Sequence, residues 1–334
     1  MITSFDEEVD PFLTRVEKSG IRTNPLYSRL HDDSLILTHA YIYTRSPTQQ
    51  VPLKVGDVVK MDLGCHLDGY IAVAAHTVVI AEDAAPAPSE TLSLTAVAAY
   101  HAMLVAAHSI QAGKTNVDVT KAVERVATHY GVKPISSVRM HQMKRFVLDG
   151  VKEVALKEPT GQDIEEGEEK LPECKFEQFE VYAVDVAMSS GDGKARPGEL
   201  RTTVFKRNVE TNYKLKMKAS RALLSEVDKK FPTLPFTLRH FEDEKSAKMG
   251  ITECVAHGLL TPYPSLHEKS GDVAHFKCTV LLLPSGTTRV TGLDMPDYFK
   301  TDKEPDEETG AILKELADVA AKKAKKKANK KKKK

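Results

Sequence analysis

Residues 58–80 read VVKMDLGCHLDGYIAVAAHTVVI, and this stretch decides the fold. Two apolar runs, 57–63 and 70–80, flank a turn that contains glycine. Runs of this length, rich in Val and Ile, predict two antiparallel strands joined as a hairpin. One acid, Asp62, interrupts the first strand. An acid in a strand is a candidate ligand of a metal ion, and such a site would need a second acid from elsewhere in the chain.

The rest of the chain alternates between strand and helix patterns. Ser89 and the pair Thr115 and Asp118 are typical helix starts, and they predict helices that run to about Ala112 and Tyr130. Further expected elements are strands at 134–139, 145–156, 176–190, 200–207 and 273–283, a mobile loop at 158–173, a helical block at 210–268, a hairpin at 284–292 and a helix at 305–323. Antiparallel hairpins with helices on one face predict an α+β fold.

The charge of the chain is divided between two parts. The 334 residues carry a net charge of +1, but residues 322–334, KKAKKKANKKKKK, contain ten lysines and no acid. Without them, 38 basic residues remain against 47 acidic ones, a net charge of −9. We therefore expect an acidic body with a strongly basic tail. No run of 18 apolar residues is present, so no membrane partner is expected.

The four cysteines (Cys65, Cys174, Cys254 and Cys278) are widely spaced and form no CxxC pair. This spacing argues against a disulfide framework or a structural zinc site, and it is typical of a reducing compartment. Three other residues in or beside predicted strands could bind a divalent metal through oxygen or imidazole: Asp62, His141 and Asp185. Alternatively, each is a buried polar residue satisfied by hydrogen bonds.

Five segments together resemble a known family: KMDLGCHLDGYIAVAAHTVVI (60–80), VRMHQMKRFVLDG (138–150), EVYAVDVAMSSGDGKA (180–195), RTTVFKR (201–207) and HFKCTVLLLP (275–284). They resemble the pita-bread (creatinase/aminopeptidase) fold of the peptidase M24 superfamily, which includes the methionine aminopeptidases. The similarity is strongest to a non-peptidase branch, the proliferation-associated and growth-factor-receptor-binding proteins, with a curved-DNA-binding protein among them. It covers about residues 46–334.

The resemblance implies a domain plan. Residues 46–305 are expected to form an aminopeptidase-like domain with a helical insert at 212–268, and residues 306–334 a helix followed by the lysine-rich tail. Residues 1–45 do not match the family and stay unassigned. Either the N-terminal half is trimmed, or the gene model starts at the wrong place. We favour the second explanation.

The resemblance also places five metal ligands of the active aminopeptidases on this sequence. Asp, Asp, His, Glu and Glu of the enzymes fall on Asp62, Val73, His141, Asp185 and Lys277. Valine cannot bind a metal, and a protonated lysine has donors but no acceptor. We therefore expect no metal, no cofactor and no catalytic residue, with Lys277 paired to Asp62 or Asp185. A substrate-contacting histidine of the enzymes is replaced by Asp149.

Two basic regions are candidate nucleic-acid contacts. The first, in the insert, comprises Lys214, Lys216, Lys218 and Arg221. The second is the tail, with Lys322, Lys323, Lys325, Lys326, Lys327, Lys330, Lys331, Lys332, Lys333 and Lys334. Lysine runs bind phosphates without sequence preference, although a solvated charged surface explains both regions as well.

The sequence and the resemblance together predict a catalytically inactive, monomeric protein that binds ribosomal RNA and the large ribosomal subunit. Its expected role is in ribosome biogenesis, translation or growth control, in the cytoplasm and in the nucleus or nucleolus, with DNA and regulatory proteins as further partners. Two alternatives stay open: an active metal-dependent methionine aminopeptidase, and a transcription-related factor that binds curved DNA.

Overall fold

The computed structural model describes residues 37–41, 54–80, 88–165, 169–198 and 202–332. Of the unassigned residues 1–45, only the strand β1 (Leu37–Tyr41) lies within the described residues. It pairs with the strand that carries Asp62, and the two run antiparallel.

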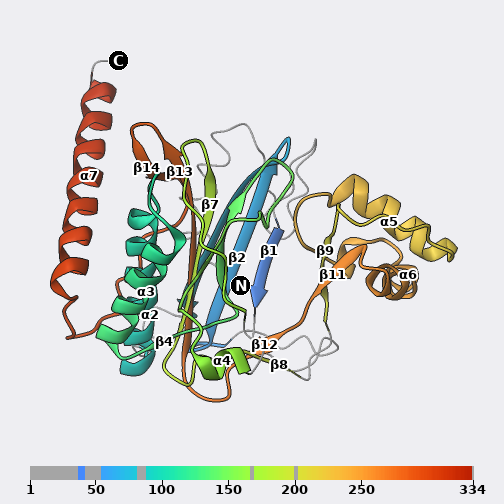
Figure 1. The fold of residues 1–334 in the computed structure, drawn as a ribbon, viewed down its shortest axis with the longest axis horizontal. Helices are drawn as coiled ribbons and strands as arrows, with labels where there is room; N and C mark the ends of the chain where they lie inside the picture. The colour runs from blue at the N-terminus through green and yellow to red at the C-terminus, as the bar shows by residue number, and fades with distance from the viewer. Residues whose placement is uncertain (1–36, 42–53, 81–87, 166–168, 199–201, 333–334) are drawn as a thin grey trace.

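Nine of the described strands form one sheet, in the order β1-β2-β3-β13-β7-β5-β6, with β14 beside β13 and β4 beside β7 (Figure 1). The strands are β2 (Val58–Leu67), β3 (Tyr70–Val79), β4 (Lys133–Pro134), β5 (Arg139–Met143), β6 (Glu153–Ala155), β7 (Val181–Ser189), β13 (Val273–Leu283) and β14 (Gly286–Arg289). The predicted hairpin at 58–80 and the strand at 273–283 are confirmed, and the α+β prediction with them.

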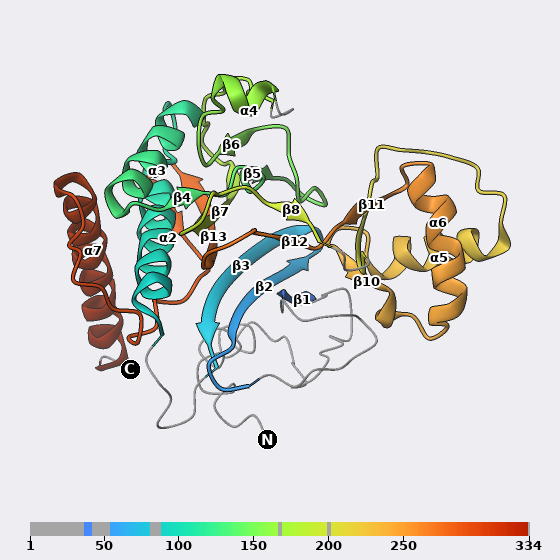
Figure 2. The same ribbon diagram turned by 90° about the horizontal axis from the view of Figure 1, so that it is seen from below.

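Two helices cover one face of this sheet (Figure 2). Helix α2 (Glu90–Ser109) is capped by Ser89, and helix α3 (Asn116–Tyr130) begins with the expected capping box of Thr115 and Asp118. Helix α2 is apolar on nearly all sides because it lies between the sheet, α3 and the last helix, α7 (Glu307–Lys332). Its length and hydropathy would also suit a membrane span, but 72% of it is buried inside the protein, as in a core helix.

The helical insert stands to one side of the sheet with a small core of its own (Figures 1 and 2). Helices α5 (Lys218–Lys230) and α6 (Glu244–Ala256) pack together through buried residues such as Leu223, Val227 and Ile251. Its other elements are β9 (Val204–Arg207), which lies before the expected boundary at residue 212 but pairs with two strands of the insert, β10 (Phe236–Thr237) and β11 (Leu260–Tyr263), and the short helix η1 (Leu238–His240). They are followed by β12 (Leu266–His267), which pairs with β8 (Arg196–Pro197).

Several sequence predictions need correction. The strand expected at 145–156 is a loop followed by the short β6, because Phe146 has a positive φ of 63° and Gly150 lies against the Gln142 carbonyl, where a Cβ would come within 2.5 Å. The strand expected at 176–190 begins only at Val181, after a second positive φ, 69° at Phe179.

The other differences concern helices. The loop expected at 158–173 contains a short helix, α4 (Gly161–Glu165). The block expected to be helical at 210–268 also contains β10, β11 and β12. Helix α7 continues to Lys332, well beyond the expected end at residue 323. Lysine and alanine both favour the helix, and lysines near a helix C-terminus interact favourably with its dipole.

Candidate functional site

Three charged residues lie in one row across the middle of the sheet. Asp62 on β2 is opposite Ala75 on β3, Ala75 is opposite Lys277 on β13, and Lys277 is opposite Asp185 on β7. Residues in register on antiparallel strands point to the same face. The small side chain of Ala75 leaves the space above β3 open, so the lysine can reach across that strand to Asp62.

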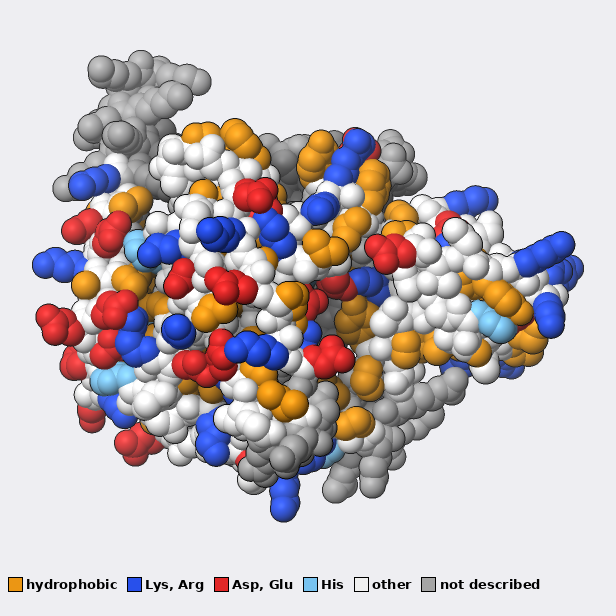
Figure 3. Space-filling view, in the orientation of Figure 1, with side chains coloured by type: hydrophobic (Ala, Val, Ile, Leu, Met, Phe, Trp, Pro, Cys, Tyr) orange, Lys and Arg blue, Asp and Glu red, His pale blue; other side chains and the backbone are white. Residues whose placement is uncertain are grey.

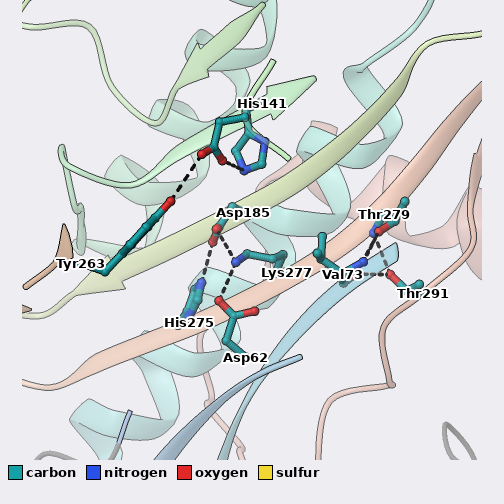
Figure 4. Close-up of polar contacts among 10 residues, drawn as sticks. Asp62, Val73, His141, Asp185, Tyr263, His275, Lys277, Thr279 and Thr291 are labelled. Atoms are coloured by element: carbon teal, nitrogen blue, oxygen red, sulfur yellow. Dashed lines mark hydrogen bonds and ion pairs between the residues drawn. The ribbon is translucent and has the colours of Figure 1, made fainter. Parts of the chain in front are cut away.

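The lysine bridges the two acids (Figure 4). The Nζ of Lys277 lies 2.6 Å from Oδ2 of Asp62 and 2.8 Å from Oδ2 of Asp185. On the other side, Nε2 of His275 lies 2.5 Å from Oδ1 of Asp185. We call these four residues the Lys277 cluster. The expected pairing of Lys277 with Asp62 or Asp185 is thus present, and with both acids at once.

The charges in this cluster depend on one another. Burial by itself lowers the pKa of Lys277, but the carboxylates of Asp185 and Asp62 outweigh burial and raise that pKa above its usual value. Burial by itself raises the pKa of Asp185, but Lys277 and His275 hold that pKa well below its usual range. The lysine is therefore a fixed ammonium group between two carboxylates.

Val73, where the resemblance places the second ligand, lies in an apolar environment. Its side chain is buried in a cluster with Ile71, Met143 and Leu234, the last of which belongs to the insert. Its backbone is held by side chains of threonines: Val73 N donates to Oγ1 of Thr279 at 2.9 Å, and Oγ1 of Thr291 donates to Val73 O at 2.6 Å. The side chain of Val73 itself offers no oxygen or nitrogen ligand.

His141 belongs to a neighbouring group and not to the Lys277 cluster (Figure 4). Its Nε2 lies 3.7 Å from Oδ1 of Asp149, whose other oxygen, Oδ2, forms an ion pair with Lys206 and accepts a hydrogen bond from the Tyr263 hydroxyl at 3.4 Å. We call this group the Asp149 bridge, because it joins the loop after β5 to β9 and β11 of the insert. Burial, assisted by the charge of Lys277, lowers the pKa of His141, and burial lowers that of Lys206 to about 8.

These residues do not fit a pair of divalent metal ions. Such a pair needs several carboxylate oxygens, but here an ammonium group fills the space between Asp62 and Asp185, and Val73 is apolar. Like unit charges 4 Å apart repel by roughly 4 kcal/mol at an effective dielectric constant of about 20. In the described part of the chain, no group of three His, Cys, Asp or Glu side chains is arranged to hold a metal ion.

The basic residues of the insert lie at and before the start of α5, and all are exposed: Lys214, Lys216, Lys218 and Arg221. We call these four the α5 cluster. Helix α5 begins only at Lys218, so the four residues do not share one helical face. Lys214 and Lys216 lie on the irregular segment before the helix, and Arg221 donates from Nη1 to the carbonyls of Leu215 (3.1 Å) and Lys216 (2.6 Å) in that segment.

A carboxylate of α6 completes this arrangement. Met217, the N-cap of α5, offers no capping side chain, and Glu253 instead accepts hydrogen bonds from the backbone N–H of Lys216 (2.7 Å) and Met217 (3.1 Å). An open groove of about 620 Å³ follows α5, lined by Tyr213, Lys214, Leu215, Arg221, Leu224, Ser225, Asp228 and Lys229. No acid within the described residues forms an ion pair with the α5 cluster.

The basic tail lies on α7. Lys322 is exposed, and Lys323, Lys325, Lys326, Lys327, Lys330, Lys331 and Lys332 are on the same helix, whereas Lys333 and Lys334 lie outside the described residues. The helix ends at the upper left of the molecule in Figure 1, away from the sheet.

Comparison with known proteins shows the family of the chain. The model of metallopeptidase family M24 matches residues 35–168. The curved DNA-binding protein of Schizosaccharomyces pombe is 35% identical over 91% of this chain and 80% of its own length. The chain belongs to the M24 family.

Within the M24 family, its relatives include the non-peptidase branch. Proliferation-associated protein A of Dictyostelium discoideum is 42% identical over 74% of this chain and 62% of its own length, so the chain spans about three-fifths of that relative. A solved structure of a thermophilic Arx1 superposes with a TM-score of 0.73 at 27% identity, over 84% of this chain and 82% of that one. The pita-bread fold is thereby confirmed.

Sequence reasoning missed two residues of these sites. His275 precedes Lys277 by two positions on the same strand, so the alternation of β13 places both on one face. Tyr263 joins Asp149 from 114 residues away, and no local signal could have indicated that contact.

Proposed function

We propose that this protein is a catalytically inactive M24 protein that binds ribosomal RNA on the large ribosomal subunit. The observation that carries the first half of the proposal is the position of Lys277, which bridges Asp62 and Asp185 at 2.6 and 2.8 Å. The carboxylates that would bind a pair of metal ions are neutralised by an ammonium group. A metal pair therefore cannot activate a water molecule there. The fold then serves as a scaffold for binding.

The RNA half of the proposal rests on two basic surfaces attached to an acidic body. The α5 cluster is exposed and free of acid partners among the described residues, and the lysines of the tail extend from the body on α7. Cations of this kind bind phosphates and release counterions, which makes binding depend strongly on salt. The proposed role is in ribosome biogenesis, translation or growth control, as a monomer in the cytoplasm and in the nucleus or nucleolus.

Co-sedimentation with purified 60S subunits at physiological salt tests the proposal. Deleting residues 322–334, or replacing all four residues of the α5 cluster by alanine, is expected to lower the pelleted fraction, and the combination is expected to abolish it. The matched control replaces four exposed lysines elsewhere, Lys114, Lys121, Lys300 and Lys303, and is expected to pellet like the wild type. Unchanged pelleting of both basic variants would defeat the RNA-binding proposal.

A second candidate is a binder of curved DNA, because the fission-yeast relative carries that name. Contacts to phosphates alone do not separate the two nucleic acids. Competition between large-subunit RNA and a curved DNA duplex for the same protein at physiological salt separates them. We expect RNA to displace DNA at equal phosphate concentration, and the opposite result would favour the DNA-binding candidate.

The absence of peptidase activity is tested separately. Purified protein incubated with a methionyl tripeptide and either Mn²⁺ or Co²⁺ is expected to release no methionine. Metal-dependent release that disappears on replacing Asp62 by asparagine would overturn the proposal that the site is inactive.

A further inference from the structure

An exposed aromatic cluster lies at one end of the sheet. The turn between β2 and β3 presents Leu67 and Tyr70, which are 50% and 67% exposed, and the neighbouring loop after β5 presents Phe146, which is 41% exposed. In Figure 3, hydrophobic side chains lie beside Lys and Arg side chains over the upper ends of β2 and β3. Large exposed apolar groups that gather in one place mark interaction sites more often than single exposed residues do.

The guanidinium group of an arginine lies over both the Tyr70 and the Phe146 ring. The guanidinium carbon of Arg145 lies 5.4 Å from the centre of the Tyr70 ring and 5.2 Å from the centre of the Phe146 ring. Its Nε donates to the carbonyl of Asp68 at 2.8 Å, and its guanidinium also forms an ion pair with the Asp68 carboxylate. We call Tyr70, Arg145 and Phe146 the aromatic–arginine cluster. Its planar groups are fixed in place before any ligand arrives.

Backbone strain keeps the Phe146 ring at the surface. Phe146 has a positive φ angle of 63°, which bulky residues seldom adopt, whereas the 49° of Asp68 is usual for the Asp-Gly turn of a hairpin. The two loops are joined where Phe146 N donates to Gly69 O at 2.9 Å, and a Cβ on Gly69 would come within 2.6 Å of the ring. Strain of this kind persists where the surroundings impose it, and it gathers at binding sites.

The charge around the cluster favours a phosphate-bearing ligand. Lys144, next to Arg145, is exposed, and no acid in the described part of the chain forms an ion pair with it. Aromatic rings and guanidinium planes stack on unpaired bases, and neighbouring cations bind the phosphates between those bases. The turn between β2 and β3 lies on the upper side of the molecule in Figure 1, with α5 to its right and the end of α7 to its left.

We propose that the aromatic–arginine cluster binds unpaired nucleotides of an RNA strand, with bases stacked on Tyr70 and Phe146 and a phosphate held by Lys144. This inference rests on the RNA-binding function proposed above and adds a contact that distinguishes single strands from duplexes. A protein partner would also use aromatic residues and arginine, but the cation of Lys144 and the position between two basic elements favour RNA.

A single tryptophan can report the stacking directly, because the chain contains none. In the Tyr70→Trp variant of the full chain, we expect a 12-nucleotide oligouridylate to quench the indole fluorescence, and a 12-base-pair RNA duplex at equal phosphate concentration to leave it nearly unchanged. Equal quenching by the duplex, or none by either RNA, would overturn the proposal. Quenching only by an acidic peptide of alternating Leu and Asp would assign the cluster to a protein partner and would also overturn it.

Affinity measurements separate the stacking from the phosphate contact. Tyr70→Ala and Phe146→Ala are each expected to weaken oligouridylate binding about five-fold or more, with the salt dependence unchanged. Lys144→Ala is expected to reduce the log–log salt slope by about 0.7. The matched control is Phe179→Ala, which removes another exposed phenylalanine, 73% exposed and with a positive φ, at the same end of the sheet. Equal effects of control and cluster variants contradict the assignment.

The two proposals fail in different ways. If 60S pelleting depends on the α5 cluster and the tail while the tryptophan reporter does not respond, only the inference about unpaired nucleotides is wrong. If the reporter responds while pelleting is unchanged, the cluster binds single-stranded RNA and the ribosomal proposal is wrong. Each variant is compared with the wild type by thermal unfolding, so that a loss of binding through misfolding is recognised.

Discussion

Lys277 Nζ and Asp62 Oδ2 lie 2.6 Å apart, although 215 residues separate them in the chain. The two strands that carry them, β13 and β2, are not hydrogen-bonded neighbours, because β3 lies between them. Their contact depends on the register of three strands and on the small Ala75 between them. The ion pair of Lys277 and Asp62 can therefore form only when β2, β3 and β13 pair in the correct register.

Replacing Lys277 by methionine should destabilise the protein strongly. The two carboxylates of Asp62 and Asp185 would remain beside each other without their cation, and breaking a buried pair in this way costs about 3–5 kcal/mol. Urea unfolding followed by circular dichroism measures the change. The control is Lys230→Ala, which breaks an exposed ion pair with Glu226 and should cost less than about 1 kcal/mol. Similar losses for both variants would contradict the structural role of Lys277.

Replacing Lys277 by glutamate should create a dependence on divalent cations. Three carboxylates would then meet where one ammonium group now balances two acids, and a bound cation would relieve their repulsion. A ligand that binds only the folded state raises the melting temperature. We expect 1 mM Mn²⁺ to raise the melting temperature of this variant and to leave that of the wild type unchanged. An equal rise in the wild type would mean that the native residues already bind the ion.

Stability should fall between pH 6.5 and pH 4 because of two histidines, the buried His76 and the partly buried His101. Burial lowers the pKa of His76, with a partial opposing effect of Asp294, and that of His101, each to about 4, whereas unfolded histidine titrates near 6.5. The unfolded chain then binds more protons in this range, so the stabilisation is complete above pH 6.5 and is lost as the pH falls towards 4.

Urea midpoints at pH 7 and pH 5 test this dependence. The wild type should unfold at lower urea concentration at pH 5, and His101→Gln should show a smaller difference between the two pH values. The imidazole of His101 contacts the Tyr130 hydroxyl at 2.8 Å, and glutamine keeps a polar partner there without a titrating group. A pH difference as large in the variant as in the wild type would exclude His101 as a source.

Replacing Asp149 by alanine should loosen the insert against the sheet. The carboxylate forms an ion pair with Lys206 and accepts from Tyr263, and both residues belong to strands of the insert. Without the Asp149 carboxylate, the half-buried ammonium of Lys206 loses its counterion. Burial already lowers the pKa of Lys206 to about 8. Hydrogen exchange should become faster at 204–207 and 260–263. Glu226→Ala, on the outer surface of the same insert, is the control and should leave these segments unchanged.

Local patterns were sufficient for several elements. The hairpin at 58–80, the strand at 273–283 and the capping box at Thr115 were predicted correctly, because alternation of apolar residues and capping chemistry act over a few neighbouring residues. The strands expected at 145–156 and 176–190 were too long. Positive φ angles at Phe146 and Phe179 interrupt them, and both are large hydrophobic residues for which the sequence offers no such warning.

The candidate sites also depend partly on residue types and partly on contacts between distant segments. The sequence by itself determined that residue 277 is a lysine and residue 73 a valine, and so which charge and which donor atoms these positions carry, because these are properties of the residue type. Only the tertiary structure decided which groups meet. Lys277 bridges two acids, His141 faces Asp149, and Arg145 lies over the rings of Tyr70 and Phe146. Each of these contacts joins residues of different strands or loops, so their distances depend on strand register and on the packing of the insert, which no local pattern encodes.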